Sequence, residues 1–361
     1  MDAILEKFSG AIRRASAARP LRLRGGGTKD FYGQVLEGEL LDTRGYSGIV
    51  AYEPSELVIT ARCGTTLAEV ERALGERGQI LAFEPPYFGA GATSPATLGG
   101  VVAAGLSGPR RAAAGAVRDF VLGVKIMDAR GDVLSFGGQV MKNVAGYDVS
   151  RLMAGSLGTL GLILEVSLKT LPAPVAEASL RLELPEGKAI EQLNRWGGRP
   201  LPISASAWAD GELAVRVSGA AAAVRAACEA IGGERLENGY ARRFWDGIRE
   251  HSDPFFIPSA ESGTPLWRIS VPSITPALAI PGAQLIEWGG ALRWLASQAD
   301  ARTVRDAAAR AKGHATLFRG GDKSVGVFQP LAPALMEIHR TLKRAFDPQG
   351  IFNRGRMYAD F

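Results

Sequence analysis

The first part of the chain alternates between stretches with helical apolar spacing and short apolar runs. Apolar residues of the segment Met1 to Arg19 fall on one face of a helix, which predicts an amphipathic first helix. Leu57 to Ala61 and Ile80 to Phe83 are predicted strands. Between them, the capping-box pattern Thr66 to Glu69 predicts a helix that ends near Arg77.

From Val117 onwards the apolar period changes to two. Val121 to Met127 and Val133 to Phe136 are separated by the turn-forming residues Ala129 to Asp132, which predicts a hairpin. Gly161 to Thr170 predicts a further strand of the same kind. This part of the chain is therefore expected to be antiparallel.

A break in the pattern divides the chain. Leu171 to Pro174 is predicted to be a linker, after which shorter strand and helix signals alternate up to about Gln329. A last helix is expected over Ala332 to Phe346, and the dense turn chemistry from Asp347 to Gly355 predicts a tail that is held in defined structure. We expect an α+β fold with segments 1–173, 174–330 and 331–361, the last packing back on the first.

Composition and charge narrow the class of protein. The 361 residues are 46% hydrophobic and can bury a large core. The net charge of +5 comes from interspersed charges, which argues against nucleic-acid binding. Cys63 and Cys228 lie far apart without CxxC spacing, so neither a disulfide framework nor a metal site is expected, and the cytoplasm is the default location. No apolar run reaches the length of a membrane span.

Two glycine-rich segments indicate where chemistry could occur. Arg24 to Lys29 follows the apolar run Leu21 to Leu23, and its glycines let several backbone N–H groups converge on an anion. Ala96 to Gly100 opens a small-residue helix, predicted from about Leu98 to Gly105, whose first amides are expected to face an anion. Two such loops suit a pyrophosphate. The spacing fits neither a Rossmann fingerprint nor a P-loop.

Five motifs in order resemble the FAD-binding domain of the vanillyl-alcohol oxidase (PCMH) type. They are Pro20 to Lys29, Thr97 to Gly100, Arg118 to Gly123, Lys142 to Asp148 and Gly155 to Gly161, with a tail motif over Phe346 to Asn353. Within that superfamily the chain is most similar to the FAD-binding E subunits of glycolate oxidase, a resemblance that includes Pro265 to Pro272. Arg354 stands where the family tail usually has proline, and Leu157 where catalytic relatives commonly have glutamate.

The resemblance implies a two-subdomain FAD-binding domain over 1–173 and an α/β cap domain over 174–330. It also implies the FAD-binding residues. These are Arg24, Gly25, Gly26, Gly27, Thr28, Lys29, Thr97, Leu98, Gly99, Gly100, Ala103, Gly105, Ile163 and Asn353. Core packing is the alternative role for Leu98 and Ile163, and a turn position is the alternative for Asn353.

The positions of the histidines and of two arginines predict how FAD is attached and which residues could be catalytic. Relatives that link FAD covalently use a histidine or cysteine, whereas all histidines of this chain (His251, His314 and His339) lie beyond Pro174, so FAD is expected to be non-covalent. The candidate catalytic residues are Arg268, His314 and Arg319. A strand-edge role for His314 and a salt bridge for Arg268 are the alternatives, and no metal site is expected.

Two functions follow from the resemblance. In the first, the chain is a redox-active FAD subunit of a glycolate oxidase that is inactive alone and passes electrons to an iron–sulfur subunit. In the second, it is an assembly module whose FAD is structural, with all chemistry in a D-type flavoprotein subunit. Both functions imply these two subunits as partners, a small 2-hydroxy acid as the substrate of the complex, and a peripheral membrane location only through the complex.

Overall fold

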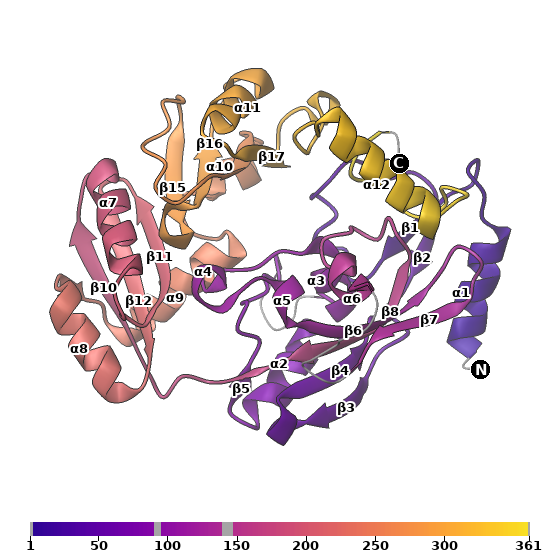
Figure 1. Ribbon diagram of the computed structural model, residues 1–361, viewed down its shortest axis with the longest axis horizontal. Helices are drawn as coiled ribbons and strands as arrows, with labels where there is room; N and C mark the ends of the chain where they lie inside the picture. Colours follow the sequence, from indigo (N-terminus) through magenta and orange to yellow (C-terminus); the bar gives the residue numbers. More distant parts are fainter. Residues whose placement is uncertain (1–2, 90–94, 139–146, 360–361) are drawn as a thin grey trace. The chain divides into compact units, whose positions relative to one another are not determined.

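The computed structural model describes residues 3–89, 95–138 and 147–359. Their contacts divide them into two compact units. The first comprises the described residues of Met1–Leu106, Ala116–Pro172 and Pro330–Phe361, and the second comprises Ser107–Gly115 and Ala173–Gln329. The longer of its two excursions out of the first unit begins after β9 (Leu171–Pro172) and ends before α12 (Pro333–Phe346) (Figure 1). The motif residues Lys142 to Gly146 lie outside the described ranges.

The first unit is built on an antiparallel five-stranded sheet of order β3-β4-β8-β6-β7. Its strands are β3 (Ile49–Glu53), β4 (Val58–Arg62), β6 (Val121–Met127), β7 (Val133–Gly137) and β8 (Leu162–Lys169). The central strand β8 is buried along almost its whole length, as its apolar composition requires. The predicted hairpin is confirmed, since β6 and β7 pair around the turn that follows Asp128.

Two short strand pairs and several helices complete this unit. β1 (Leu21–Arg24) runs parallel to β2 (Glu39–Asp42), and β5 (Gln79–Ile80) pairs with β9 (Leu171–Pro172). The helices are α1 (Ala3–Arg14), α2 (Leu67–Gly75), α3 (Leu98–Ala104), α5 (Val117–Phe120), α6 (Val149–Met153) and α12 (Pro333–Phe346). The Thr66 hydroxyl caps α2 by accepting from the Glu69 amide at 3.2 Å, as the capping pattern predicted.

Three local predictions need correction. The first helix ends at Arg14, five residues before the expected end. The expected strand over Ile80 to Phe83 is a two-residue pair, and its partner Leu171–Pro172 was assigned to the linker. The period-two region begins at Val121, because residues 117–120 form a single helical turn.

The second unit is an antiparallel eight-stranded sheet of order β13-β10-β12-β11-β15-β16-β14-β17. Its strands are β10 (Ala176–Glu183), β11 (Ile203–Ala209), β12 (Glu212–Gly219), β13 (Glu234–Arg235), β14 (Leu266–Ser270), β15 (Ala283–Glu287), β16 (Leu292–Ala296) and β17 (His314–Arg319). Its helices are α4 (Arg111–Ala114), α7 (Glu186–Gly197), α8 (Ala221–Ile231), α9 (Asn238–Glu250), α10 (Ile257–Glu261) and α11 (Ala301–Arg310).

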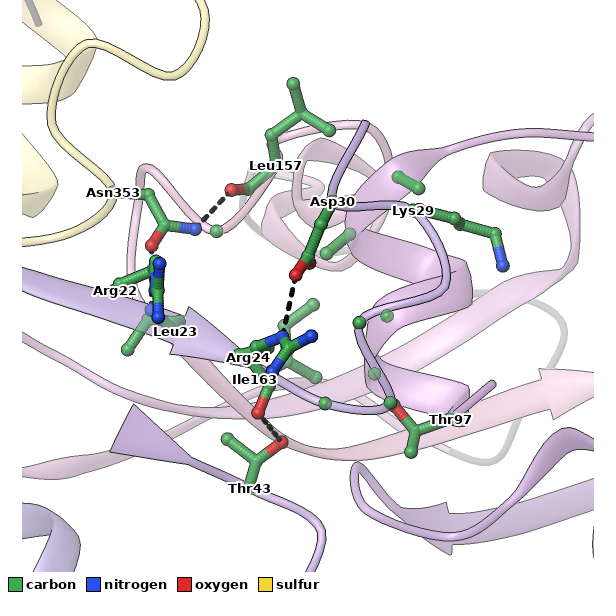
Figure 2. A pocket seen from close by; sticks show the side chains of 18 of the residues that line it. Arg22, Leu23, Arg24, Lys29, Asp30, Thr43, Thr97, Leu157, Ile163 and Asn353 are labelled. Atoms are coloured by element: carbon green, nitrogen blue, oxygen red, sulfur yellow. Dashed lines mark hydrogen bonds and ion pairs between the residues drawn. The ribbon is translucent and has the colours of Figure 1, made fainter. Parts of the chain in front are cut away.

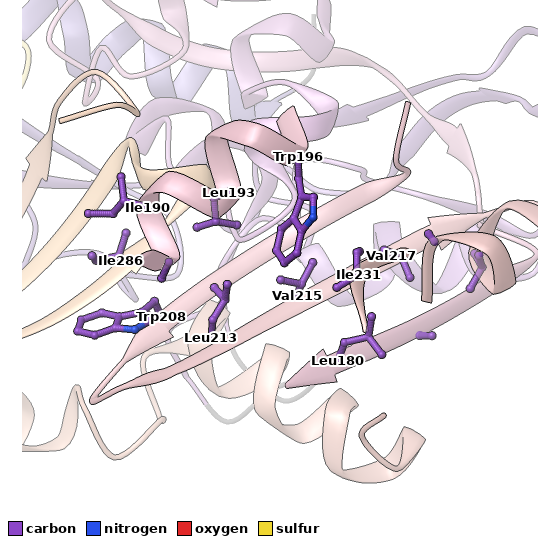
Figure 3. Close-up of a cluster of buried hydrophobic side chains, with 14 residues drawn as sticks. Leu180, Ile190, Leu193, Trp196, Trp208, Leu213, Val215, Val217, Ile231 and Ile286 are labelled. Carbon is purple, nitrogen blue, oxygen red and sulfur yellow. The ribbon is translucent and has the colours of Figure 1, made fainter. Parts of the chain in front are cut away.

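Two apolar cores hold helices against this sheet. Figure 3 shows Leu193 and Trp196 of α7 projecting towards Leu213 and Val215 of β12, which alternate along one face of the strand. A second core packs α11 against β14 and β17. Residues 107–115, which were expected in the first domain, group with this unit. The Trp288 indole donates to the Gly108 carbonyl at 3.1 Å within it.

Candidate functional site

A cavity of about 260 Å³ lies in the first unit. It is bounded by β1, the glycine loop that follows it, α3, the segment before and into β8, and the C-terminal tail (Figure 2). Its lining residues are Arg22–Asp30, Val35, Leu36, Thr43, Cys63, Thr97, Gly99, Gly100, Ala103, Ala104, Leu157, Gly158, Gly161–Ile163, Asn353 and Arg356.

The loop after β1 contains glycines because neighbouring atoms leave no room for side chains there. A Cβ on Gly25 would overlap the Thr97 hydroxyl, and one on Gly26 would overlap the Pro95 carbonyl. Gly27 has a φ of 74°, which glycine adopts without the strain other residues incur. The loop therefore presents backbone rather than side chains to the cavity, as close approach by a phosphate requires.

The start of α3 is packed closely against the end of β4. A Cβ on Gly99 would lie 2.6 Å from the Cys63 Cβ. The amides of Leu98 and Gly99 donate to the Thr65 and Cys63 carbonyls, both at 2.9 Å. The expectation that these first amides face an anion is therefore wrong for Leu98 and Gly99.

Thr97, immediately before α3, carries a hydroxyl that no described residue bonds. Its residue is 3% exposed, and its hydroxyl finds no hydrogen-bond partner among the described residues. Buried hydroxyls normally form hydrogen bonds. An unbonded hydroxyl at the wall of a cavity therefore indicates that a polar ligand or water binds there.

The charged side chains of the lining are mostly cationic. Arg22, Arg24, Lys29 and Arg356 stand against one carboxylate, Asp30. Arg24 is turned towards Asp30, and their side chains form an ion pair at 2.7 Å (Figure 2). The Arg22 Nε is buried without a hydrogen-bond partner among the described residues. The cavity therefore favours an anion.

The C-terminal tail closes one wall of the cavity through Asn353. The Leu23 amide donates to its Oδ1 at 2.8 Å, and its Nδ2 donates to the Leu157 carbonyl at 2.7 Å. Asn353 is thus a bridge between β1 and the segment before β8 (Figure 2). Lys343 of α12 fixes the tail further, because its ammonium donates to the carbonyls of Thr159 and Phe352 and to the Asp347 carboxylate.

All but two of the predicted FAD-binding residues line this cavity, and the exceptions are Leu98 and Gly105. The Leu98 side chain is fully buried in the core. Gly105 ends α3 with a φ of 68°, and a Cβ there would meet the Gly155 backbone. Both residues therefore serve the packing of α3.

Sequence reasoning missed Arg22 and Arg356 as lining residues. The only available signal for Arg22 was its spacing of two from Arg24 on a strand, which puts both side chains on one face. Arg356 lies far along the chain in a turn-rich tail, and no local pattern connects it to the glycine loop.

The candidate catalytic residues lie on two adjacent strands of the second unit. Arg268 is on β14, with its guanidinium 5.1 Å from the centre of the Trp288 ring. His314 and Arg319 begin and end β17, in register with Ser270 and Leu266. Desolvation, and then the positive charge of Arg268, lowers the pKa of His314. Burial lowers the pKa of Arg319.

His251 is the remaining histidine of this unit, and it is buried. Its ring stacks on Phe256 with centres 4.0 Å apart. Burial, with smaller contributions from Arg319 and Arg268, lowers its pKa well below the usual range. It is therefore neutral at physiological pH.

The described parts of the chain contain neither a cluster of metal ligands nor a membrane-spanning helix. Within residues 3–89, 95–138 and 147–359, no three or more His, Cys, Asp or Glu side chains gather as a metal site would require. Over the same ranges, no helix combines the length and apolar character needed to cross a bilayer.

Comparisons with known proteins agree with the geometry. Residues 5–137 match the FAD binding domain family. The chain is 49% identical over 360 residues to the glycolate oxidase subunit GlcE of Escherichia coli (strain K12), covering 99% of this chain and 97% of that protein. It is 33% identical to the glycolate oxidase subunit GlcD of Bacillus subtilis (strain 168) over 163 residues, 45% of this chain and 34% of that protein.

A solved structure of alkyldihydroxyacetonephosphate synthase superposes with a TM-score of 0.63 at 12% identity, over 97% of this chain and 74% of that one. At this identity the likeness concerns the fold alone. The residues of the cavity fit FAD, because a loop of bare backbone, an unbonded Thr97 hydroxyl and excess positive charge suit a dinucleotide pyrophosphate. The chain is an FAD-binding protein of the oxidoreductase class, and it belongs to the GlcE family of glycolate oxidase subunits.

Proposed function

We propose that the chain is the FAD-binding subunit of a glycolate oxidase complex that oxidises glycolate to glyoxylate. The reaction removes two electrons and two protons from the substrate, and the electrons leave through the flavin to an iron–sulfur subunit. The similarity to GlcE over nearly the whole chain supports the complex, and the similarity to GlcD over part of it supports a related flavoprotein as partner. Any contact with a membrane is made through the complex from the cytoplasmic side.

The observation that carries the proposal is the pairing of the glycine loop with the orphaned Thr97 hydroxyl at one cationic cavity. In this proposal the loop from Arg24 to Lys29 surrounds the pyrophosphate of FAD, and Gly99 and Gly100 approach it from α3. Ala103, Ile163 and Asn353 line the rest of the bound cofactor. Bound FAD supplies a two-electron acceptor for the oxidation of an alcohol.

The flavin is proposed to be non-covalent. Cys63 lines the cavity, yet burial raises the pKa of its thiol to about 12, so it does not supply the thiolate needed for nucleophilic attachment. No histidine is among the described lining residues. Acid precipitation is expected to release intact FAD into the supernatant, and flavin that stays with the protein pellet would contradict this.

For the substrate, we propose that Arg268 and Arg319 provide positive charge for a carboxylate. Both are cations on the neighbouring strands β14 and β17, and His314, the first residue of β17, is the candidate for a proton acceptor. The pKa of His314 is lowered, so its ring is neutral at physiological pH and able to accept a proton. Variants Arg268→Gln and His314→Asn are expected to lower the turnover of the assembled complex while its flavin content is retained.

A second candidate function is that of an assembly subunit whose FAD is not turned over. Two observations favour it. His251 is buried against aromatic rings, and its lowered pKa keeps it neutral at neutral pH. Among the described residues of strands β14 and β17, His314 is the only histidine. The chain alone is therefore expected to oxidise glycolate negligibly.

The two candidate functions are distinguished by measuring glycolate oxidation in a complex whose copy of this chain cannot bind FAD. Gly27→Asp adds a carboxylate where the loop faces the cavity and should empty the site. Gly187→Asp is the matched control, because a Cβ at that position meets nothing within 4 Å. Loss of glycolate oxidation with Gly27→Asp, in complexes of normal composition, supports the redox role. Full activity with that variant would leave only the assembly role.

A further inference from the structure

The C-terminal tail is hydrogen-bonded to the segment that follows the glycine loop. The guanidinium of Arg356 donates to the Gln34 carbonyl at 2.6 Å, and to the carbonyls of Lys29 and Asp30 at 3.2 and 3.1 Å. The Gln34 amide in turn donates to the Arg356 carbonyl at 2.9 Å. A residue near the end of the chain therefore holds both ends of the 29–34 turn.

These bonds help to fix which way the peptide groups of the turn face, together with the Tyr32 amide, which donates to the Lys29 carbonyl at 3.0 Å. The carbonyls of Lys29 and Asp30 point to Arg356, so their negative ends are neutralised there. Segment 25–38 contains no helix or strand of its own, so it lacks a regular hydrogen-bond ladder to hold this arrangement. Gly33 has a φ of 88°, and a Cβ there would lie 2.9 Å from the Arg356 Nε, so the turn and the guanidinium fit closely.

Arg356 is also a buried cation at the cavity wall. Its residue is 8% exposed and lines the cavity. None of the described carboxylates forms an ion pair with it, because the oxygens it bonds are carbonyls. The carboxylate that acts on it, Asp30, is itself ion-paired with Arg24. Burial lowers the pKa of Arg356, and of its charged neighbours Asp30 raises it while Arg22 lowers it.

We propose that Arg356 is a positioning residue for the pyrophosphate of FAD. It acts on the cofactor through the loop, by turning the carbonyls at positions 29, 30 and 34 away from the ligand, and it adds a buried positive charge beside it. This inference rests on the proposed position of the pyrophosphate in the cavity. The two terminal nitrogens of the guanidinium donate to these carbonyls at the same time, whereas a lysine has one ammonium nitrogen and cannot reach all of them.

The test compares Arg356→Gln and Arg356→Lys with Arg354→Gln in the full chain. Arg354 is the matched control, because it lies two residues away in the same tail but donates to the Ala17 carbonyl instead of the loop. The dissociation constants of FAD and ADP are measured by calorimetry on apoprotein, well below the unfolding temperature of each variant. Hydrogen exchange is followed over residues 27–34.

Arg356→Gln is expected to weaken both FAD and ADP on the order of 100-fold, which corresponds to about 2.8 kcal/mol. Arg356→Lys is expected to weaken them about tenfold, and Arg354→Gln less than about twofold. Exchange at 27–34 should rise in the two Arg356 variants only. A role confined to stability would lower the unfolding temperature and leave ADP affinity unchanged.

Affinities of Arg356→Gln within threefold of the unmodified chain would overturn the inference. If that variant does not fold, Arg356→Lys decides, and unchanged affinity with unchanged exchange in it is the contradicting result. Gly26→Val tests the position of the pyrophosphate separately, since its side chain would meet the Pro95 carbonyl. If Gly26→Val still binds FAD, the proposed position of the pyrophosphate is refuted. If Gly26→Val loses FAD but Arg356→Gln binds it normally, only the role of Arg356 is refuted.

Discussion

Replacement of Asn353 by aspartate tests how the tail holds the cavity together. The change keeps the shape of the side chain and the oxygen that accepts from Leu23, but it removes the Nδ2 donor. A carboxylate oxygen then faces the Leu157 carbonyl at the position where the present bond is 2.7 Å long. The residue is 4% exposed and the bond is buried, so bulk water does not freely replace the lost donor.

The magnitude follows from the groups left unbonded. A buried carbonyl without a donor costs about 1–3 kcal/mol, and repulsion between two oxygens adds to it, so we expect a loss of roughly 2–4 kcal/mol. For a folding unit of this size this lowers the melting temperature by about 5–15 °C. The affinity for FAD should fall as well, because Leu23 lies on the strand that leads into the glycine loop.

The assay is thermal and urea unfolding of Asn353→Asp beside Asn238→Asp, an exposed residue at the first turn of α9, where the added charge is expected to stabilise by about 0.3–1 kcal/mol rather than to destabilise. The protonated acid can donate to the Leu157 carbonyl, so the new carboxyl should have a raised pKa. The deficit relative to the unmodified chain should therefore shrink as the pH falls through that value. A melting temperature within 1 °C of the control at neutral pH (about 0.3 kcal/mol) would refute this account of Asn353.

Three further outcomes are expected. Thr97→Val should weaken FAD by about 2–12-fold without destabilising the apoprotein, because no described residue bonds its hydroxyl, and unchanged affinity would contradict this. Burial keeps the folded-state pKa of His251 low, so stability should fall as the pH drops below about 6.5, by up to about 1.4 kcal/mol per pH unit. His251→Asn should remove that slope in urea titrations. Lys343→Met should cost about 3–5 kcal/mol in urea, whereas the exposed Lys188→Met should cost almost nothing.

Local backbone demands made much of the candidate site predictable from the sequence. Gly25, Gly26 and Gly27 predict the loop from sequence, because close contacts at the first two and a left-handed φ at Gly27 exclude other residues. The hairpin of β6 and β7 was predictable for the same reason, since alternation and turn chemistry are local. The hairpin and the conformation of Gly27 depend on neighbours within a few positions along the chain, whereas Gly25 and Gly26 are kept free of side chains by the distant residues Thr97 and Pro95.

Features that depend on distant contacts were missed. The amides of Leu98 and Gly99 are taken by carbonyls of the β4–α2 connection, about 35 residues earlier, which no pattern around α3 reveals. Arg356 bonds to carbonyls more than 300 residues away, and a carbonyl leaves no trace in side-chain identity. The linker residues Leu171–Pro172 were misassigned because a two-residue pairing has too few positions to show a period.

The central claim is that this chain binds FAD in the cavity between the glycine loop and α3. Its most direct test is the flavin content of the purified chain, of Gly27→Asp and of the control Gly187→Asp, read by absorbance after acid release and divided by protein. The account predicts one FAD per chain in the unmodified protein and in the control, and essentially none in Gly27→Asp of unchanged circular dichroism. Equal flavin content in all three proteins would contradict it.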